Sequence, residues 1–570
     1  MKRLLSGNEA IAQGAYEAGV KVASGYPGTP STEILENLAK YEGVYAEWAP
    51  NEKVALEVAI GASLANARAL AAMKHVGVNV AADPLFTLSY TGVEGGLVLV
   101  SADDPSLYSS QNEQDNRYYA KFAKIPMLEP TDSQEAKDLV KQAFEISEQY
   151  DTPVMLRVTT RIAHSETIVD IGERIELDRK AEFVQDIPKY VMVPAHASKR
   201  HVLVEERLKK LQELSNEFNK IEYSQKGLGI ITSGVAYQYA KEVFPDASYL
   251  KLSMSYPLPQ KLIREFAENV SEIYVIEELD PFIEEQVKAM GISVKGKDYL
   301  PICGELNPDI VRKSFLTSPP NPKEEGGRSI PSRPPVLCPG CPHRGVFYVL
   351  KKLRLNVTGD IGCYTLSTLP PLSALHTCIC MGASIGIAHG IDKAGEQQKT
   401  VAVIGDSTFI HSGITGLINI VYNKGTSTVI ILDNRTTAMT GGQAHPATGY
   451  TLQKEATKAL DFAKLGEAIG IEHVCIIDPY DLDETERVIL QEVERPEPSL
   501  IITNRPCILL DRKSRKPPKK IDQEVCKFCK LCLRLGCPAL LLKEDSLEIN
   551  PILCAGCGLC SRICNSEAVV

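Results

Sequence analysis

The sequence predicts a multidomain α/β protein with doubly wound, mostly parallel sheets and a small α+β domain at its C-terminal end. Continuous apolar runs bounded by turn residues recur along the chain, as is typical of parallel strands buried on both faces. Helical stretches separate these runs, which favours strand–helix–strand units. Half of the 16 cysteines fall after residue 525, where such runs stop. The last segment is therefore expected to be a separate, cysteine-rich domain.

Length and charge limit the classes of function. The chain has 570 residues, and single cores rarely grow beyond about 250–300 residues, so several domains are expected. A net charge of −10 argues against a nucleic-acid partner. No apolar run reaches the roughly 20 residues that cross a bilayer, and residues 1–8 lack a signal-peptide core. We therefore expect a cytoplasmic protein with no membrane partner.

Residues 1–195 are expected to form a first α/β domain, with strands at 96–100 and 153–158. An Ala-rich helix is expected over 52–73, and a turn at 26–30 followed by a capping box. Glu52 begins that helix, where a buried carboxylate is costly without a partner. The alternative is an exposed first-turn acid that the helix dipole favours.

Residues 196–316 are expected to form a second α/β unit, with a charged helical connector at 196–225 and strands at 229–232 and 273–276. The segment 317–335 contains six prolines and two glycines without periodicity. Such a composition is typical of an extended linker between domains.

A third α/β domain is expected over residues 336–510, with strands at 401–404, 428–432 and 500–502 and a helix at 414–423. The first strand runs into Gly405, Asp406 and Ser407, and the second into Asp433 and Asn434. Ligands of open α/β sheets bind at the carboxyl ends of the strands. These polar residues are therefore candidates for a binding site.

The residue types at these two strand ends indicate a magnesium and phosphate site. A hard cation such as Mg²⁺ takes oxygen ligands, usually one or two protein groups plus phosphate oxygens. Asp406 and Asn434 can supply two such oxygens, and a backbone carbonyl near Thr436 a third. Gly405 would allow a diphosphate to approach the backbone.

The cysteine spacing of the tail predicts two iron–sulfur clusters in a domain spanning 523–570. Each set has three cysteines at two-residue gaps and a fourth further on, which in two-cluster ferredoxins ligates the other cluster. Zinc has no use for this crossed spacing, and disulfides suit small secreted chains. The expected ligand sets are Cys526, Cys529, Cys532 and Cys564 for one [4Fe–4S] cluster, and Cys537, Cys554, Cys557 and Cys560 for the other.

Residues 511–522, just before the tail, include six basic residues and two prolines. One interpretation is a flexible, solvated tether. The other is a docking patch for an acidic electron acceptor.

Several motifs together resemble one enzyme family. Gly405-Asp406 with the distant Asn434 resembles the diphosphate-binding motif of thiamine diphosphate enzymes, and Glu52 resembles the glutamate of their aminopyrimidine-binding domains. Residues 26–30 (YPGTP) resemble a substrate-side turn of 2-oxoacid:ferredoxin oxidoreductases. Residues 338–343 (CPGCPH), 377–382 (TCICMG) and 433–441 (DNRTTAMTG) are similar to signatures of one branch, the large (α) subunits of indolepyruvate:ferredoxin oxidoreductases. The resemblance covers the whole chain.

The resemblance implies domains, cofactors and an activity. It makes 1–195 an aminopyrimidine-binding domain, 196–316 a transketolase-C-terminal-like domain, 336–510 a diphosphate-binding domain and 523–570 a bacterial-type ferredoxin domain. The implied cofactors are thiamine diphosphate, Mg²⁺ and two [4Fe–4S] clusters, with coenzyme A as co-substrate. The implied reaction converts aryl 2-oxoacids (indolepyruvate, phenylpyruvate, 4-hydroxyphenylpyruvate) to aryl-acetyl-CoA and CO₂, with ferredoxin as electron acceptor. A smaller β subunit in an α₂β₂ assembly is implied as partner.

The resemblance also assigns roles to single residues. Glu52 is expected to hydrogen-bond the aminopyrimidine ring, Thr29 to lie near the substrate, and His343 to contact substrate or diphosphate. Arg117 is either near the substrate carboxylate or an ordinary surface or salt-bridged arginine.

The remaining cysteines have open interpretations. Cys338 and Cys341 have the spacing of a zinc or redox pair, but no second pair is nearby in the sequence, so a pocket-lining loop is expected. Cys363, Cys378 and Cys380 are expected to be packed small residues.

Two rival functions remain. One is an oxidoreductase for another 2-oxoacid, such as a phenylglyoxylate or branched-chain acid. The other is an electron-transfer subunit without catalytic activity. Whether an active site forms within one chain or between two chains is not determined by the sequence.

Overall fold

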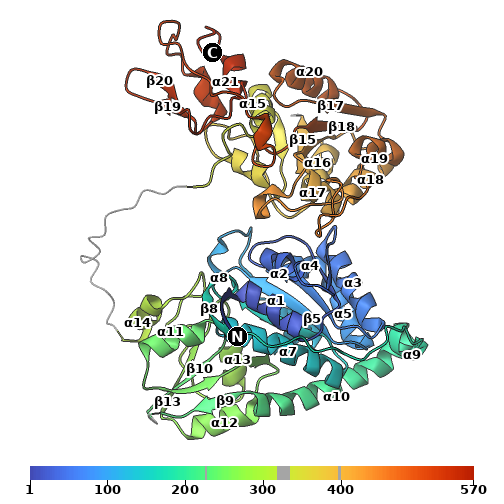
Figure 1. Ribbon diagram of the computed structural model, residues 1–570, viewed down its shortest axis with the longest axis vertical. Helices are drawn as coiled ribbons and strands as arrows, with labels where there is room; N and C mark the ends of the chain where they lie inside the picture. Colours follow the sequence, from blue (N-terminus) through green and yellow to red (C-terminus); the bar gives the residue numbers. More distant parts are fainter. Residues whose placement is uncertain (225–226, 317–333, 396–398) are drawn as a thin grey trace. The chain divides into compact units, whose positions relative to one another are not determined.

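The computed structural model describes residues 1–224, 227–316, 334–395 and 399–570. They form two compact units, Met1–Arg328 and Ser329–Val570. The division falls in the expected linker at 317–335, most of which lies outside the described residues. Both units are built from parallel sheets and helices, and the second ends in the cysteine-rich segment (Figure 1). The predicted fold class is therefore confirmed.

The first unit is organised around a seven-stranded sheet. Its order is β12-β6-β7-β5-β4-β2-β3, and only β12 is antiparallel to its neighbour. The strands β4, β5 and β7 are buried at every position, which explains their continuous apolar sequences. The bounds are β2 Val22–Gly25, β3 Tyr45–Trp48, β4 Ala69–Lys74, β5 Leu97–Asp103, β6 Met127–Leu128, β7 Val154–Thr159 and β12 Met254–Tyr256.

Helices alternate with these strands along the chain. Helix α1 packs closely on α7, because Gly14 leaves room for the backbone of Lys137. A short antiparallel pair, β1 (Lys2–Ser6) with β8 (Glu166–Asp170), stands apart from the main sheet. The main helices are α1 Gly7–Glu17, α2 Thr32–Leu38, α3 Glu52–Leu64, α4 His75–Val80, α5 Ala82–Thr91, α6 Arg117–Ala123 and α7 Ser133–Tyr150.

A second sheet of the first unit has the order β13-β10-β11-β9. The expected connector is the long helix α10, and the strand β12 from this region joins the first sheet, so the two regions share one core. The elements are α10 Pro194–Phe218, β9 Lys220–Glu222, β10 Leu228–Thr232, α11 Ala236–Val243, β11 Ser248–Lys251, α12 Gln260–Glu268, β13 Glu272–Ile276, α13 Phe282–Ala289 and α14 Pro308–Leu316.

Two local predictions in the first unit are wrong. The helix expected over 52–73 ends at Leu64, because the next alanine-rich stretch is the buried strand β4 between β2 and β5. Alanine suits a helix by propensity, but here the pairing of the sheet decides. The capping box is also absent: the hydroxyl of Ser31 donates to the carbonyl of Gly28 at 2.8 Å and makes no cap bond to α2.

The second unit contains a five-stranded parallel sheet of order β14-β15-β16-β18-β17. The predicted strands and the helix between β15 and β16 are all present. The elements are α15 His343–Leu353, β14 Asn356–Thr358, α16 Ala383–Lys393, β15 Thr400–Gly405, α18 Ile414–Tyr422, β16 Thr428–Asp433, α19 Phe462–Ile469, β17 His473–Ile477, α20 Leu482–Val493 and β18 Ser499–Asn504.

The cysteine-rich tail packs against this sheet domain. It consists of the short 3₁₀ helix η6 Leu531–Leu535, the hairpin of β19 Leu540–Leu542 and β20 Leu547–Ile549, and α21 Leu559–Ile563. Leu535, Leu559 and Ile563 belong to the same core as Phe347 and Leu350 of α15. The tail is thus part of the second unit.

The basic segment 511–522 is not a free tether. The amide of Lys516 donates to the carbonyl of Ala555 at 3.3 Å, and the amide of Asp522 donates to the carbonyl of Ala568 at 2.8 Å. Lys520 and Val570 exchange two backbone hydrogen bonds. Its charged side chains remain largely exposed. In the described ranges, no helix has both the length and the apolar character that crossing a bilayer requires.

The contact between α1 and α7 can be tested at Gly14. A Cβ there would lie 2.3 Å from the carbonyl oxygen of Lys137, so Gly14→Ala should destabilise the first unit by about 1–3 kcal/mol through overpacking. Gly61→Ala on α3 is the control, because a Cβ there meets nothing within 4 Å and should stabilise the helix by about 0.5–1 kcal/mol. Calorimetric unfolding of the full chain measures both. Equal effects of the two variants would contradict the packing described.

Candidate active site and metal centres

The strands β15 and β16 are neighbours, so their carboxyl ends bring Asp406 and Asn434 to the same edge of the sheet. Both residues are buried, at 2% and 8% exposure. One oxygen of Asp406, Oδ1, accepts the N–H of Ser407 at 2.8 Å, and the other, Oδ2, accepts the N–H of Arg435 at 2.8 Å. Arg435 adopts a left-handed conformation with φ of 62°. The backbone at this edge is therefore shaped around the carboxylate of Asp406.

A second carboxylate, Asp433, is buried beside Asp406. Burial, and then the negative charge of Asp406, raise the pKa of Asp433 to about 6. His445 lies 3.2 Å from Asp406 Oδ2. Two buried carboxylates side by side favour either a shared proton or a bound cation. This donor set fits Mg²⁺, which takes carboxylate and carbonyl oxygens and completes its shell with water or phosphate.

The other predicted residues of this edge lie around Asn434. The amide Oδ1 of Asn434 accepts the N–H of Thr436 at 3.1 Å, and its Nδ2 lies 3.3 Å from Nε2 of His343. Burial lowers the pKa of His343 to about 4, so the imidazole is neutral and can accept this bond. The hydroxyl of Ser407 accepts a bond from Thr437 at 3.0 Å. The structure thus brings together the residues predicted for this site.

Gly405 is at the end of β15 for a reason that the sequence does not show. A Cβ at this position would lie 2.9 Å from Cε1 of the Tyr364 ring. The N–H of Gly405 donates to the hydroxyl of Tyr364 at 3.0 Å. The close approach of this buried tyrosine, rather than the approach of a ligand alone, requires glycine here.

In the first unit, a comparable edge carries Thr29 after β2, Glu52 after β3 and Lys74 at the end of β4. Glu52 is 6% exposed, and Gly77 leaves room for it, because a Cβ there would lie 2.7 Å from Glu52 Oε1. The carbonyl of Thr29 accepts a bond from Ser109 at 3.2 Å. Glu52 is therefore buried, as expected.

Lys74 is a member of this edge that sequence reasoning missed. Its ammonium donates to the carbonyl of Ser109 at 2.7 Å. Burial lowers the pKa of Lys74 to about 8, against the opposing charges of Asp104 and Glu52. Its position at the carboxyl end of a buried strand is the signal that would have identified it.

Arg117 is salt-bridged, as one of its two interpretations stated. It is 1% exposed, its Nε donates to Asp115 at 2.9 Å, and its Nη1 forms an ion pair with Glu277 at 2.5 Å. Its Nη2 also donates to the carbonyl of Asp280 at 3.0 Å. The guanidinium is occupied by protein groups, and its contact with a substrate carboxylate stays a prediction.

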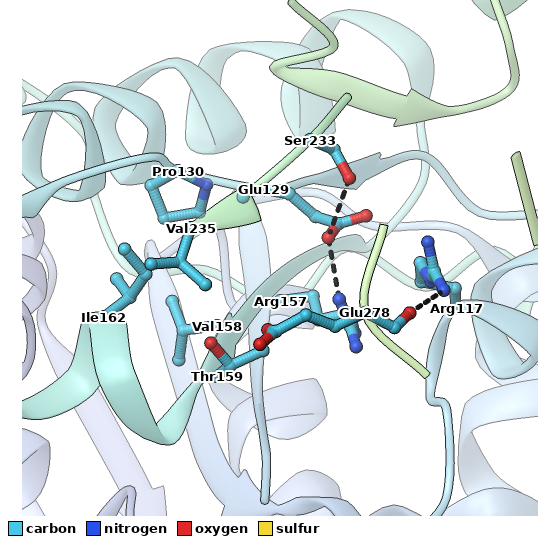
Figure 2. Close-up of a pocket in the computed structure, with 11 residues that line it drawn as sticks. Arg117, Glu129, Pro130, Arg157, Val158, Thr159, Ile162, Ser233, Val235 and Glu278 are labelled. Carbon is cyan, nitrogen blue, oxygen red and sulfur yellow. Dashed lines mark hydrogen bonds and ion pairs between the residues drawn. The ribbon is translucent and has the colours of Figure 1, made fainter. Parts of the chain in front are cut away.

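Arg117 lines a small polar pocket between the two sheets of the first unit. Figure 2 shows Glu129 between Ser233 and Arg157, whose Nη1 donates to Glu129 at 2.7 Å. Within the described residues, the buried atoms Glu129 Oε1, Arg157 Nη2 and Thr159 Oγ1 have no hydrogen-bond partner. These atoms can hydrogen-bond an ordered water, as buried polar groups commonly do. The pocket is therefore part of the polar network that joins the sheets.

The tail cysteines gather in the two sets that their spacing predicts. Cys526, Cys529, Cys532 and Cys564 line one cavity. Burial raises the pKa of Cys560 to about 12, and the charges that add to this shift come first from Cys557, Cys537 and Cys554. The long gap before Cys537 is accommodated by Gly536, which has a φ of 64° and leaves room for Pro371.

A third group of cysteines lies between the sheet edge and the tail. Burial raises the pKa of Cys363 to about 11, and the charges of Cys507 and Cys338 add to it. Burial also raises the pKa of Cys341, and the charges of Cys363 and Cys338 add to this shift. Cys338, Cys341, Cys363 and Cys507 are therefore near one another. Cys363 packs against the hydrophobic core of the second unit, as expected, and so does Cys338, while the role of Cys338 and Cys341 stays a prediction.

This third group adjoins both neighbouring sites. The N–H of Cys507 donates to the carbonyl of Asn434 at 2.9 Å. Gly340, between Cys338 and Cys341, packs so closely that a Cβ would lie 2.8 Å from Ala555 and 3.8 Å from the Cβ of Cys557. Cys363 and Cys507 both follow carboxyl ends of strands, β14 and β18, and this placement is the signal that would have found them.

None of these groups has the spacing of a mononuclear site. Among the residues that the structure describes, no three or more His, Cys, Asp or Glu side chains are arranged to hold a single metal ion. A [4Fe–4S] cube carries its four sulfur ligands on separate corners and needs a wider opening than one ion does. The crossed spacing of the two tail sets is the one that cubane clusters use, and zinc does not need it.

Comparison with known families agrees with this chemistry. The family model "Pyruvate flavodoxin/ferredoxin oxidoreductase, thiamine diP-bdg" matches residues 13–212. The model "Thiamine pyrophosphate enzyme, C-terminal TPP binding domain" matches residues 360–503. The matched regions contain Glu52 in the first case and Asp406 with Asn434 in the second. The class is that of the thiamine diphosphate-dependent 2-oxoacid:ferredoxin oxidoreductases.

Similar proteins identify the family within this class. Indolepyruvate oxidoreductase subunit IorA of Archaeoglobus fulgidus is 42% identical over 100% of this chain and 97% of that one. The IorA subunit of Pyrococcus horikoshii is 41% identical over 99% and 96%. The chain belongs to the indolepyruvate oxidoreductase IorA family.

More distant matches cover less of the chain. The 2-oxoglutarate synthase subunit KorA of Methanothermobacter thermautotrophicus is 25% identical over 48% of this chain and 86% of that one. The solved 2-oxoglutarate:ferredoxin oxidoreductase from Magnetococcus marinus, with 2-oxoglutarate, coenzyme A and succinyl-CoA bound, is 16% identical. It covers 54% of this chain and 64% of that one with a TM-score of 0.45.

The role of Arg117 can be tested by its stability cost. Arg117→Ala leaves Asp115 and Glu277 buried without their partner, and should lower the free energy of unfolding by about 3–5 kcal/mol. Arg161→Ala, which removes a half-exposed partner of Glu305, should cost at most about 1 kcal/mol. Denaturant unfolding of the full chain measures both. A stable Arg117→Ala protein that has lost only substrate affinity would restore the catalytic assignment.

Proposed function

We propose that this chain is the catalytic and electron-transferring subunit of an enzyme that oxidatively decarboxylates aryl 2-oxoacids. The products are the aryl-acetyl-CoA thioester and CO₂, and ferredoxin takes up the two electrons one at a time. One observation carries the proposal: the edge formed by Asp406 and Asn434 and three groups of cysteines lie in the same compact unit. The near full-length relatives named indolepyruvate oxidoreductase support the aryl substrate.

In this proposal, the residues of the second unit hold the diphosphate end of the cofactor. Asp406 and Asn434, with the backbone near Thr436, bind Mg²⁺, and Gly405 and Ser407 face the diphosphate. The neutral His343 keeps Asn434 oriented through the contact between Nε2 and Nδ2. Thiamine diphosphate supplies the carbanion chemistry that cleaves the bond between the keto carbon and the carboxylate.

In this proposal, the first unit recognises the aminopyrimidine end of thiamine diphosphate and the substrate. The buried Glu52 holds a proton at the aminopyrimidine ring, as its placement at the start of α3 allows. Thr29, in the turn after β2, contacts the substrate. Lys74 supplies the positive charge of this edge. Arg117 does not supply it, because its guanidinium is bound by carboxylates.

The cysteines supply three sites for one-electron carriers. Cys526, Cys529, Cys532 and Cys564 hold one [4Fe–4S] cluster, and Cys537, Cys554, Cys557 and Cys560 a second. The group of Cys338, Cys341, Cys363 and Cys507 adds a third, next to Asn434. Iron–sulfur clusters exchange single electrons, which suits an oxidation that releases two.

The remaining parts of the enzyme come from outside this chain. The relatives are named as subunits, which supports the presence of a partner chain. In this proposal the partner is a smaller β subunit that helps bind coenzyme A, and the assembly is α₂β₂. In this proposal the electron acceptor is an acidic ferredoxin. It binds to the exposed basic side chains of residues 512–520, whose charge is opposite to its own. A reducing cytoplasm is the compartment in which such clusters persist.

Variants of Glu52 and Asp406 should separate the two ends of the cofactor site. Asp406→Asn should abolish Mg²⁺-dependent binding of thiamine diphosphate, measured by anaerobic titration calorimetry. Glu52→Gln should still bind the cofactor with Mg²⁺ but lower kcat by about 10²–10⁴-fold, the usual contribution of a positioned proton-transfer group. Glu57→Gln, an exposed acid one turn later on α3, is the control.

Two outcomes would refute this assignment. Full cofactor affinity in Asp406→Asn would remove the metal role. If the wild-type protein itself bound no thiamine diphosphate, the rival of a non-catalytic electron-transfer subunit would be correct.

Iron analysis should distinguish three clusters from two. The wild-type chain should contain about twelve irons, four per cluster. The double variant Cys341→Ala/Cys363→Ala should lose about four of them, since it removes two ligands of one site. The matched double variant Cys378→Ala/Cys380→Ala should keep all, because these cysteines lie beside Asp360 and outside the group. About eight irons in both the wild-type and the first variant would contradict the third site.

A further inference from the structure

Arg344 is a buried arginine in the first turn of α15, three residues after Cys341. Within the residues that the structure describes, its guanidinium hydrogen-bonds backbone carbonyls alone. Nε donates to Cys338 at 3.0 Å, Nη1 donates to Leu535 at 2.8 Å, and Nη2 donates to Leu337. The side chain therefore connects the loop of Cys338 and Cys341 to the helix η6 of the tail, two residues before Cys537.

The charge of Arg344 lacks a conventional counter-ion. Of the five buried arginines in the described part of the chain, the other four each have a carboxylate nearby: Arg68 has Glu148, Arg117 has Asp115, Arg157 has Asp103 and Arg207 has Asp151. The charged groups that act most strongly on Arg344 are thiols, namely those of Cys537, Cys341, Cys338 and Cys557. These four belong to two of the cysteine groups described above.

A buried guanidinium without an anion is costly, since burial penalises the charged form and backbone carbonyls do not neutralise it. The thiols around it are neutral as long as they are protonated. They become thiolates when they ligate iron, and a cluster with four thiolate ligands is a net anion. The missing anion is therefore supplied once the cysteines hold their clusters.

We propose that Arg344 is the shared counter-ion of two iron–sulfur clusters, one held by the group of Cys338 and the other by the group of Cys537. This inference rests on the proposed function, because it requires both clusters. A fixed positive charge stabilises the reduced form of each cluster more than the oxidised form, since the reduced form carries one more negative charge. Arg344 thus raises the reduction potential of both clusters and acts as a positioning residue between them.

The test is a potentiometric titration of the anaerobically purified protein, with the clusters observed by electron paramagnetic resonance and with iron measured in parallel. Arg344→Gln removes the charge and should shift the potentials of these two clusters to more negative values. Arg344→Lys keeps the charge without the forked geometry and should stay close to the wild-type potentials.

A matched control is Arg562→Gln. Arg562 lies on α21 between Cys560 and Cys564, but its side chain is 47% exposed and is paired with Asp481 at 3.1 Å. Water and the carboxylate screen its charge. The potentials of this variant should equal those of the wild-type protein, so a shift in Arg344→Gln alone is not a general effect of removing an arginine near the clusters.

Each outcome decides the inference. Loss of iron in Arg344→Gln, with full iron in Arg344→Lys, supports it, because the charge is then needed to hold the anionic clusters. Unchanged potentials in a fully loaded Arg344→Gln protein would overturn it. So would equal iron loss or equal shifts in both variants, which would assign Arg344 to backbone bonding only. Wild-type protein without iron–sulfur signals would instead remove the proposed function, and this inference with it.

Discussion

The close contact between the loop of Cys338 to Cys341 and the C-terminal tail is the constraint on which the second unit depends. Gly340 has a φ of 73° and lies against Ala555 and Cys557, where no larger residue fits. Tyr480 donates to the carbonyl of Gly340, and Arg344, in the first turn of α15, donates to the carbonyl of Leu535. These contacts fix two cysteine groups next to each other. The tail is thereby a built-in part of the sheet domain rather than a domain on a mobile tether.

Much of the fold follows from the sequence, because parallel strands buried on both faces have continuous apolar sequences. This rule located β15, β16 and β18 and the polar residues at their ends, which the structure brings to one edge. It failed at β4, whose alanines suit a helix equally well and become a strand only through pairing with β2 and β5. The tail cysteines were predictable because their spacing is local. The partners of Cys341, in contrast, come from loops far apart in the chain, and only the sheet order brings Cys363 and Cys507 to it.

The buried charges of the two units have different physical roles. In the first unit, Arg117 and Arg157 neutralise carboxylates from both sheets and hold these sheets together. In the second unit, burial and the charge of Asp406 raise the pKa of Asp433, which is paired with Arg435 at 3.1 Å, and the charged groups that act most strongly on Arg344 are thiols. Arg344 lies in the same unit as the cysteine groups.

The most direct test of this account is the anaerobic reduction of the protein by its own substrate. The chain, purified with the subunit that it assembles with and supplied with thiamine diphosphate, Mg²⁺ and coenzyme A, is mixed with a 2-oxoacid in the absence of an electron acceptor. Indolepyruvate should bleach the visible absorbance of the iron–sulfur clusters, whereas 2-oxoglutarate, phenylglyoxylate and branched-chain 2-oxoacids should do so far more slowly. Clusters that dithionite reduces but no 2-oxoacid bleaches would contradict the account, and preferential bleaching by another 2-oxoacid would contradict the aryl substrate.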